Sequence, residues 1–208
     1  KNFGHAQILK GIDLYINDSE FLTILGPSGC GKTTTLRIIG GFETPTSGRV
    51  LFDGKDITAL PPNERDLNTV FQKYALFPHM SIAENIAFGL KIRKKSKAYI
   101  DDKIKYALKL VNLEGYENRS PALLSGGQQQ RVAIARAVVG KPMLILADEP
   151  TGNLDSKNSL EIMKLLSQLN AEGTTIVMVT HSQHDATYAD RIINLFDGQI
   201  VDELEGKL

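Results

Sequence analysis

The stretch that decides the fold is Phe21-Leu-Thr-Ile-Leu25, followed directly by Gly26-Pro-Ser-Gly-Cys-Gly-Lys-Thr33. An apolar run with strand character leads into a glycine-rich loop, and residues 34–39 continue as a predicted helix. The glycines let the backbone fold tightly enough for successive N–H groups to point at one anion, while Lys32 adds a positive charge and Thr33 a hydroxyl for Mg²⁺. The N-terminal end of the helix dipole adds to this attraction. The stretch therefore predicts a binding site for the phosphates of a nucleotide.

The composition of the whole chain limits the classes of protein that it can be. Its 208 residues fit one domain, or a domain with a subdomain, and 42% hydrophobic residues are enough for a core. Basic and acidic residues balance at 24 each and are interspersed, so we expect no nucleic acid as a main partner. No apolar run approaches the roughly 18 residues that cross a bilayer, and the first residues lack the apolar stretch of a signal peptide.

The single cysteine, Cys30, lies inside the glycine-rich loop. It cannot form an intramolecular disulfide, which suits a reducing cytosol. Its position favours a small filler over a nucleophile.

Short apolar segments recur along the chain and predict the strands of a sheet. Their ranges are 11–16, 21–25, 50–52, 143–147, 175–179 and 191–196. Helical spacing places apolar residues on one stripe over 159–169 and again over 101–112. Strands that alternate with helices predict an α/β fold with a largely parallel sheet, whose ligands bind at the carboxyl ends of the strands.

The middle and the two ends of the chain predict additions to this sheet. From about residue 74 to residue 139 the sequence has helical patterns and no convincing strand, which predicts a helical subdomain inserted in a single domain over 1–208. Asp53-Gly54 and Asp197-Gly198 predict hairpin turns, and so antiparallel strands near both ends. Because the sequence ends soon after the second turn, we expect no room in it for an added regulatory domain.

The segment Met143-Leu-Ile-Leu-Ala-Asp-Glu149 is an apolar strand that ends in two adjacent carboxylates. At the carboxyl end of the strand the chain turns, so both acids can reach one site. Asp148 suits the Mg²⁺ shell, and Glu149 suits the polarisation of an attacking water. The alternative is an ordinary solvated end of a strand, which the phosphate-binding loop upstream makes the weaker interpretation.

The segment Leu124-Ser-Gly-Gly-Gln128 predicts a second helix N-terminus that can hold phosphate. Ser125 is a candidate N-cap, the two glycines allow close backbone approach, and residues 128–139 continue as a helix. Taken alone, this segment is better interpreted as a loop before a helix.

Six motifs follow one another in a fixed order. They are the loop at 26–33, Gln72 after Val70-Phe71, Leu-Ser-Gly-Gly-Gln at 124–128, Asp148-Glu149, Asn153-Leu-Asp155, and His181 after Val177-Met-Val-Thr180. Together they resemble the nucleotide-binding domain of ATP-binding cassette (ABC) transporters, over essentially the whole chain. The resemblance implies a P-loop NTPase fold, Mg²⁺-dependent hydrolysis of ATP, and a head-to-tail homodimer with two ATP molecules at its interface. It also implies separate transmembrane transporter subunits, which would hold the chain at the cytoplasmic face of the membrane.

The resemblance implies a role for each motif residue. Contacts to ATP within one copy come from Phe3, Gly26, Pro27, Ser28, Gly29, Cys30, Gly31, Lys32, Thr33 and Thr34, and Phe3 is the one that stacks on adenine. Contacts from the opposite copy come from Ser125, Gly126, Gly127, Gln128 and Asp155. The Mg²⁺ ligands are Thr33, Gln72 and Asp148. The catalytic residues are Glu149, His181, Lys32 and Gln72, with Glu149 as the base that activates water.

Two features depart from the family pattern. Only two residues precede Phe3, so the first strand of the family is nearly absent, and we expect an incomplete sheet edge and adenine pocket. Residues 21–135 look like ATPases of polyamine-type importers, whereas the sequence from Leu144 on looks like ATPases of lipoprotein-release and macrolide-export systems. A natural intermediate family and an engineered or consensus chain with weak activity both explain this mosaic. The transported substrate and its direction stay open.

Other functions also stay open. An ABC-type ATPase that regulates cell-envelope or division machinery would use the same cassette without moving a solute. A P-loop kinase is a weaker alternative, because it would leave the 124–128 motif and His181 without a role.

Two further segments favour structural interpretations. His181 and His184 have the spacing of a metal pair, but no third ligand accompanies them. The basic run Lys91-Ile-Arg-Lys-Lys-Ser-Lys97 predicts a solvated loop before a helix, rather than contact with lipid headgroups or an acidic partner.

Overall fold

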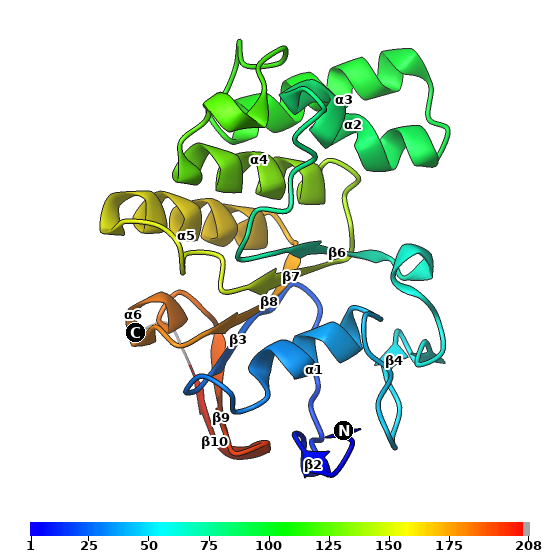
Figure 1. Ribbon diagram of the computed structural model, residues 1–208, viewed down its shortest axis with the longest axis vertical. Coiled ribbons are helices and arrows are strands. Elements are labelled where there is room, and N and C mark those ends of the chain that lie inside the picture. The colour runs from blue at the N-terminus through cyan, green and yellow to red at the C-terminus, as the bar shows by residue number, and fades with distance from the viewer. Residues whose placement is uncertain (206–208) are drawn as a thin grey trace. The chain divides into compact units, whose positions relative to one another are not determined.

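The computed structural model describes residues 1–205 as two compact units (Figure 1). The first unit comprises Lys1–Thr69, Met143–Glu149 and the described chain from Ser167 on, and the second comprises Val70–Pro142 and Pro150–Leu166. The single domain over 1–208 with its helical insertion at about 74–139 stays a prediction. No helix within residues 1–205 is both long and apolar enough to span a bilayer.

A six-stranded sheet organises the first unit, in the order β10-β9-β3-β8-β7-β6. The strands are β3 Phe21–Leu25, β6 Leu67–Val70, β7 Leu144–Asp148, β8 Thr175–Thr180, β9 Arg191–Phe196 and β10 Gln199–Glu205. β3 pairs in parallel with β8 and β9, β7 pairs in parallel with β8, and β10 is antiparallel to β9. The sheet is therefore mostly parallel with an antiparallel addition, as the sequence predicted.

The centre of this sheet is apolar on both faces. All six residues of β8 and the first four of β3 and of β7 are buried. Such continuous apolar runs are typical of parallel strands that are covered on both sides. Helix α1 (Lys32–Ile39) contacts β7 and β8, and helix α6 (Gln183–Ala186) contacts β3 and β8. Cys30, 6% exposed, belongs to the core cluster, which fits the predicted role of a small filler.

Both predicted Asp-Gly turns connect antiparallel strands. Asp53 and Gly54 join β4 (Leu51–Phe52) to β5 (Lys55–Asp56), with φ angles of 49° and 72°. The second turn, between β9 and β10, has φ angles of 44° and 75°. Positive φ at both central residues is what a two-residue hairpin turn requires. A third hairpin, β1 (Asn2–Phe3) with β2 (Ala6–Gln7), was not predicted.

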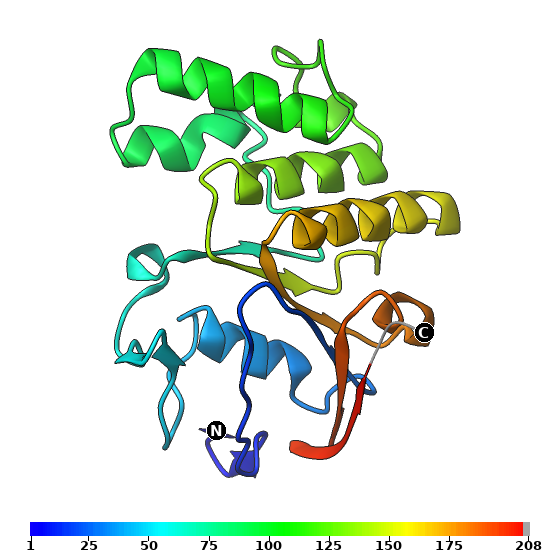
Figure 2. The same cartoon turned by 180° about the vertical axis from the view of Figure 1, so that it is seen from behind.

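The second unit contains three helices that contact one another, α2 (Ile82–Ile92), α3 (Lys97–Leu110) and α4 (Gly126–Val138) (Figure 2). Helix α5 (Ser156–Ala171) begins in this unit. Short 3₁₀ turns lie at Pro62–Glu64 in the first unit and at Pro121–Leu123 in the second. The predicted helices at 101–112, 128–139 and 159–169 are all present, and each begins two to four residues earlier than predicted, because Ser96, Ser125 and the segment before Ser156 start the first turn.

Arg65 fixes the C-terminal end of α1. Its buried guanidinium donates to the carbonyl oxygens of Ile38 at 2.8 Å, Ile39 at 2.7 Å, Leu60 at 2.9 Å and Thr58 at 3.1 Å. The last carbonyls of a helix have no partner within it, so these bonds stabilise the helix that carries the glycine-rich loop at its other end. Burial lowers the pKa of the Arg65 guanidinium from its ordinary value.

Within residues 1–205, one predicted strand is absent, and one strand of the six-stranded sheet was not predicted. Residues 11–16 alternate between exposed and half-buried side chains, as a strand would, but they pair with no strand among the described residues. Their half-buried members, Ile12, Leu14 and Ile16, pack against the core cluster instead. The strand β6 was missed because Asn68 and Thr69 interrupt its apolar pattern, although Leu67 and Val70 are buried.

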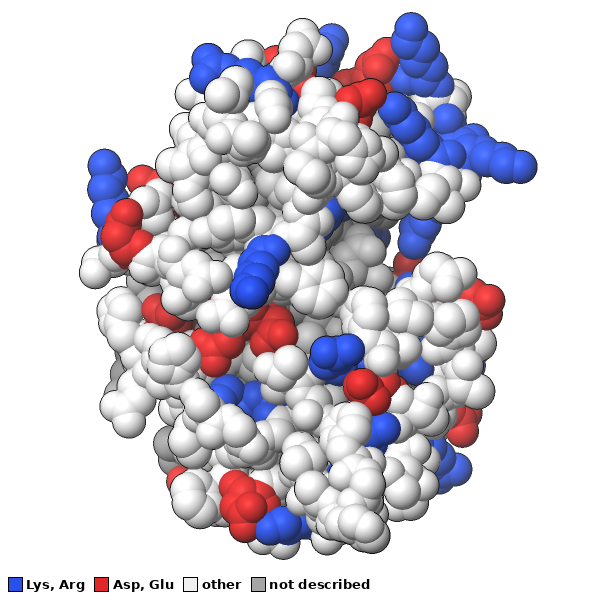
Figure 3. Space-filling model, viewed as in Figure 1, with Lys and Arg blue, Asp and Glu red and all other residues white. Residues whose placement is uncertain are grey.

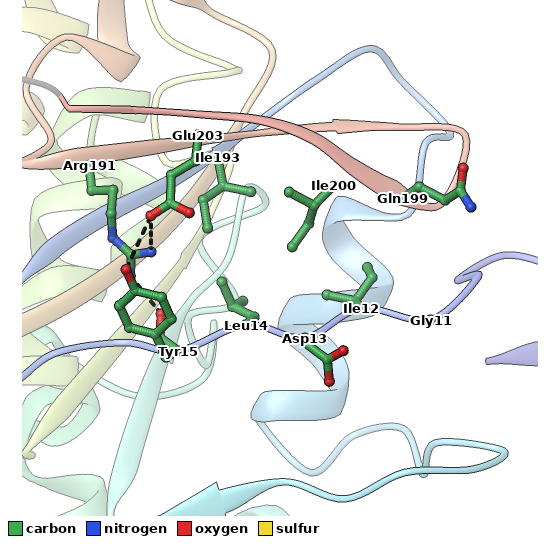
Figure 4. A pocket seen from close by; sticks show the side chains of 10 residues that line it. All are labelled: Gly11, Ile12, Asp13, Leu14, Tyr15, Arg191, Ile193, Gln199, Ile200 and Glu203. Atoms are coloured by element: carbon green, nitrogen blue, oxygen red, sulfur yellow. Dashed lines mark hydrogen bonds and ion pairs between the residues drawn. The ribbon is translucent and has the colours of Figure 1, made fainter.

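A groove of about 330 Å³ lies between residues 11–15 and the β9–β10 hairpin (Figure 4). Ile12, Leu14, Ile193 and Ile200 form its apolar part. At one end Arg191 stacks over the Tyr15 ring, 4.1 Å from its centroid.

Arg191 is the centre of an ion cluster in this unit, in which Arg191 and Glu20 are buried and Glu203 is exposed. Its guanidinium donates to Glu20 Oε1 at 2.5 Å, to Glu203 Oε1 at 2.7 Å and to the Tyr15 carbonyl at 2.6 Å. The bonds to Glu20 are the largest cause of a raised pKa of Arg191. Both Arg191 and Glu20 are 8% exposed, so each needs the other.

We predict that Arg191→Met lowers the free energy of unfolding by about 3 kcal/mol or more, because it leaves the buried Glu20 carboxylate without its ion pair. The matched variant Lys10→Met removes an exposed pair with Asp197 and should cost less than about 1 kcal/mol. Urea unfolding of both variants measures the difference. Equal losses would contradict the central position of the Arg191 cluster.

Candidate active site

Glycines shape the loop between β3 and α1. Gly29 and Gly31 have φ angles of 82° and 107°, which residues with a side chain rarely adopt. A Cβ on Gly26 would collide with the carbonyl oxygen of Leu195 and lie 2.9 Å from Cys30 Sγ. The backbone can therefore close over an anion only with glycine at these positions.

Lys32 is held inside this loop. Its ammonium donates to the carbonyl oxygens of Gly26 at 2.8 Å and Pro27 at 2.9 Å, and the residue is 5% exposed. Both partners are neutral oxygens of the same loop that the anion would enter. A phosphate oxygen, which carries a full charge, can replace either of them with a stronger bond.

Thr33 and Asp148 face each other across the loop and the end of β7. The Thr33 hydroxyl donates to Asp148 Oδ1 at 3.0 Å. Burial raises the pKa of the Asp148 carboxyl and the charge of Glu149 adds to this, while the bond from Thr33 opposes it. A hydroxyl and a carboxylate are hard oxygen donors, and Mg²⁺ is usually bound by one or two carboxylates together with phosphates and waters. This pair therefore fits the predicted ion.

Glu149 and His181 form a second contact in the same unit. Glu149 Oε2 lies 2.9 Å from His181 Nδ1. An ionised carboxylate only accepts, so this bond assigns the ring proton to Nδ1. The backbone of Glu149 has a φ of 48°, and its N–H donates to the Val179 carbonyl at 3.0 Å. A positive φ at a residue with a long side chain is held only where surrounding bonds fix it, and it redirects the side chain from the strand.

Ser125 caps helix α4 in the second unit. The Gln128 N–H donates to Ser125 Oγ at 3.3 Å, and the Ser125 N–H donates to Gln128 Oε1 at 3.0 Å. This is the reciprocal capping box that the sequence pattern favours. A Cβ on Gly127 would collide with the side chain of Asn158, and one on Gly126 would lie 2.6 Å from the Tyr74 hydroxyl. The two glycines are thus required by close packing on either side of the cap.

Asp155 and Gln72 also lie in the second unit. Asp155 accepts from the N–H and the side-chain amide of Asn158, both at 2.8 Å, and these bonds lower the pKa of its carboxyl. Both carboxylate oxygens are thus bonded at the start of α5. The Gln72 carbonyl accepts from Asn153 Nδ2 at 3.0 Å, and the Gln72 side chain is exposed.

Sequence reasoning missed the residue that shapes the segment after Gln72. Arg136 on α4 donates to the carbonyls of Ala75 at 2.7 Å and Tyr74 at 3.3 Å. Both residues have positive φ, 29° at Tyr74 and 50° at Ala75. No sequence pattern marks such backbone angles in residues other than glycine, asparagine or aspartate. The only available signal was an arginine on the predicted helix.

Phe3 lies in the N-terminal hairpin of the first unit. Its ring is exposed, and the Lys1 ammonium lies 4.6 Å from its centroid. Its predicted role at adenine stays a prediction. Within residues 1–205, no group of three or more His, Cys, Asp or Glu side chains could hold a metal ion, so the spacing of His181 and His184 has no third protein ligand there.

Residues 9–152 match the sequence profile of the family described as ABC transporter. The chain belongs to the ABC transporter family. This confirms the resemblance drawn from the order of the six motifs.

Similar proteins extend the match over the cassette as a whole. The chain is 58% identical over 205 residues to the spermidine/putrescine import ATP-binding protein PotA of Clostridium novyi (strain NT), covering 96% of the chain and 58% of that protein. It is 55% identical over 202 residues to the PotA protein of Acetivibrio thermocellus, covering 96% of the chain and 57% of that protein. The chain thus spans less than two thirds of the length of these relatives.

A solved structure described as the dimeric structure of MJ0796, a bacterial ABC transporter cassette, superposes with a TM-score of 0.87 at 40% identity. The match covers 97% of the chain and 91% of that cassette. A second structure, of the ATP-binding cassette MJ0796 bound to ADP and Pi, matches with a TM-score of 0.85. The predicted α/β cassette fold is confirmed.

We predict that Gly127→Ala destabilises the cassette by about 1 to 3 kcal/mol, because the new methyl group must displace Asn158 from Asp155. Gly89→Ala is the matched control on α2, where a Cβ meets nothing within 4 Å. It should stabilise by roughly 0.5 to 1 kcal/mol, since alanine favours a helix. Denaturant unfolding tests the opposite signs. A neutral Gly127→Ala would show that the contact with Asn158 yields freely.

We also predict that Asp148→Asn stabilises the cassette at neutral pH without metal or nucleotide. Burial raises the pKa of Asp148 in the folded chain, so its ionisation at neutral pH lowers stability. The amide keeps an oxygen that accepts from Thr33, so the gain comes from removing the buried charge alone. It should vanish below the ordinary aspartate pKa of about 4, where the carboxyl is protonated in both states.

The control for this prediction is Asp155→Asn, for which the opposite sign is expected. Hydrogen bonds lower the pKa of Asp155, so its charge stabilises the folded chain above the ordinary pKa, and its loss should destabilise at neutral pH. Urea unfolding in a chelator, at neutral and at acidic pH, measures both variants. A destabilising Asp148→Asn at neutral pH would contradict the argument from burial.

Proposed function

We propose that the chain is the ATP-hydrolysing cassette of a membrane importer. The observation that carries this proposal lies within the first unit, where Lys32, the Thr33–Asp148 pair and the Glu149–His181 pair follow the carboxyl ends of β3, β7 and β8. These groups bring a phosphate-binding loop, oxygen donors for a divalent cation and a base for water to one edge of a parallel sheet. The relatives named as import ATP-binding proteins support the same reading.

The phosphate-binding part of the mechanism rests on the loop at 26–33. Its N–H groups and the Lys32 ammonium would bind the β- and γ-phosphates, with Lys32 exchanging the carbonyls of Gly26 and Pro27 for phosphate oxygens. Thr33 and Asp148 would hold Mg²⁺. The role of Gln72, which lies in the second unit, stays a prediction. Mg²⁺ would offset the negative charge that gathers on the phosphates during transfer.

The chemical step requires a water in line with the bond from the γ-phosphorus to its leaving oxygen. We assign Glu149 the role of orienting this water and accepting its proton. His181 donates from Nδ1 to the carboxylate and thereby fixes its direction. If Nε2 also contacts the γ-phosphate as a donor, the ring must be the imidazolium, which adds positive charge where it is needed.

The 124–128 motif lies in the second unit and presents a capped helix N-terminus with exposed Ser125. We propose that it completes the site of a second copy, with Ser125, Gly127 and Gln128 facing the γ-phosphate there. The dimeric structures described for MJ0796 support a pair of cassettes. Asp155, whose oxygens are bonded to Asn158, would act by holding the start of α5 rather than by touching the nucleotide.

We predict that Glu149→Gln binds ATP normally but loses most of its turnover, since an amide accepts no proton from water. A dimer should then accumulate with ATP. Phosphate release, calorimetric ATP binding and light scattering measure the three effects. Lys32→Ala has the opposite expectation, because it should weaken ATP binding itself. Near-normal turnover in Glu149→Gln would eliminate Glu149 as the base.

We further propose polyamines as the substrate class of the importer that this cassette serves, with separate transmembrane subunits as partners at the cytoplasmic face. The names of the two PotA relatives, as spermidine/putrescine import proteins, support this. The test is to isolate the membrane protein that co-purifies with the chain and reconstitute both with a binding protein for the solute. Spermidine or putrescine should raise ATP hydrolysis, whereas an unrelated solute such as maltose should not. Stimulation by maltose alone would contradict the proposal.

A further inference from the structure

The charges of this chain are distributed unevenly even though they sum to zero. Residues 91–110 contain eight of the 24 basic residues and two of the 24 acidic ones, a local net charge of +6. The rest of the chain therefore carries sixteen basic and twenty-two acidic residues, a net charge of −6. Figure 3 shows the basic side chains gathered at its upper right, over the turn between α2 and α3. The net charge of zero therefore includes one strongly positive region of the surface.

The positive residues lie on an exposed corner of the second unit. Every residue from Lys91 to Tyr99 is exposed, and these nine residues include five cations and no carboxylate. Lys94, with a φ of 52°, reverses the chain after α2, and Ser96 Oγ accepts from the Tyr99 N–H at 3.3 Å to start α3. A short capped turn between two helices keeps the cations close together. We call residues 91–99, with Lys103 and Tyr106, the basic corner.

Aromatic side chains are interleaved with these cations. The Lys95 and Lys103 ammonium groups lie 5.9 Å and 5.4 Å from the Tyr99 ring centroid, and Lys103 lies 5.6 Å from that of Tyr106. Both rings are exposed. These contacts connect the turn at 91–97 with one stripe of α3. The carboxylates nearest in sequence, Asp101 and Asp102, flank this stripe and reduce its charge only in part.

Ile92 lies in the middle of the cations and is 65% exposed. Exposure of an apolar side chain of this size to water is unfavourable in free energy. The same side chain is stabilised when it enters the boundary between lipid headgroups and acyl chains. Tyrosine, with an apolar ring and a polar hydroxyl, is also suited to that boundary. A purely ionic partner, such as the phosphate backbone of nucleic acid, would leave Ile92 without an apolar environment.

We propose that the basic corner is a docking surface for anionic lipid headgroups, with its cations at the phosphates and Ile92 inserted among them. This contact is separate from ATP hydrolysis, since no residue assigned to the active site belongs to the corner. It would attach the cassette directly to a membrane surface, in addition to any protein partner.

The test is co-sedimentation of the whole chain with vesicles, without nucleotide. Vesicles of phosphatidylcholine containing phosphatidylglycerol should bind the chain, and pure phosphatidylcholine vesicles should not. Each cation near such a surface contributes about fivefold in partition, so Lys94→Gln with Lys95→Gln and Lys97→Gln should weaken binding roughly a hundredfold. High salt should have the same effect on the unmodified chain.

Two matched controls separate this surface from general charge and hydropathy. Neutralising the exposed Lys55, Lys141 and Lys164 to Gln removes the same charge elsewhere and should change binding by less than about fivefold. Ile92→Ser should weaken binding to the anionic vesicles, whereas Leu51→Ser, at a comparably exposed position, should not.

Three results would overturn the proposal. They are equal binding to both kinds of vesicle, equal losses in the two triple variants, and no vesicle binding at all with capture of an acidic protein instead. ATP hydrolysis by the corner variants should match that of the unmodified chain, so the outcome does not depend on the proposed catalytic roles.

Discussion

The parallel register of β3, β8 and β7 is the constraint on which the active site depends. Leu25 is paired with Thr180, and Val179 with Asp148, so the three strands end at the same edge of the sheet. Whatever follows each strand must then emerge at that edge. The glycine-rich loop follows β3, Glu149 follows β7 and His181 follows β8. Slippage of one strand by a residue would exchange its side chains between the two faces, and the close packing of side chains on both faces resists this.

Bringing the carboxylates of the candidate site together has an electrostatic cost, which other interactions in the fold must offset. Asp148 and Glu149 are neighbours with like charge, and burial already raises the pKa of Asp148. The positive φ of Glu149 adds backbone strain, of roughly 1 to 3 kcal/mol for such a residue. The buried Arg191–Glu20 pair, by contrast, satisfies its charges and holds another part of the same sheet. The first unit thus contains two kinds of charged cluster. The charges of Arg191 and Glu20 neutralise each other, as in a structural cluster, whereas Asp148 and Glu149 repel each other until a positively charged ligand binds, as in a functional site.

The sequence allowed the sheet and most of the candidate site to be predicted, because local patterns determine them. Short, mainly apolar segments identified β3, β7, β8 and β9. Asp-Gly pairs identified two hairpins, since few residues other than these accept two successive positive φ angles. The loop, the acidic strand end and the 124–128 motif were found for a similar reason. Each needs particular residue types at fixed spacing, so chemistry and sequence correspond directly. The contact of Glu149 with His181, 32 residues apart, follows once both strands are placed in parallel.

The features that were not predicted depend on contacts between residues that lie far apart in the sequence. Exposed and half-buried side chains alternate over residues 11–16, as they would in a strand. This alternation shows only which side chains face the core. A strand also needs a neighbouring strand to pair with its N–H and carbonyl groups. Arg136 and the two positive φ angles at Tyr74 and Ala75 explain one another only after α4 is folded against that segment. The basic corner was visible as a charge run, but its interleaved tyrosines became part of the argument only when α3 placed Tyr99, Lys103 and Tyr106 on one stripe beside the turn. In each case the local sequence pattern was compatible with more than one structure, and contacts with residues distant in the sequence determined which one formed.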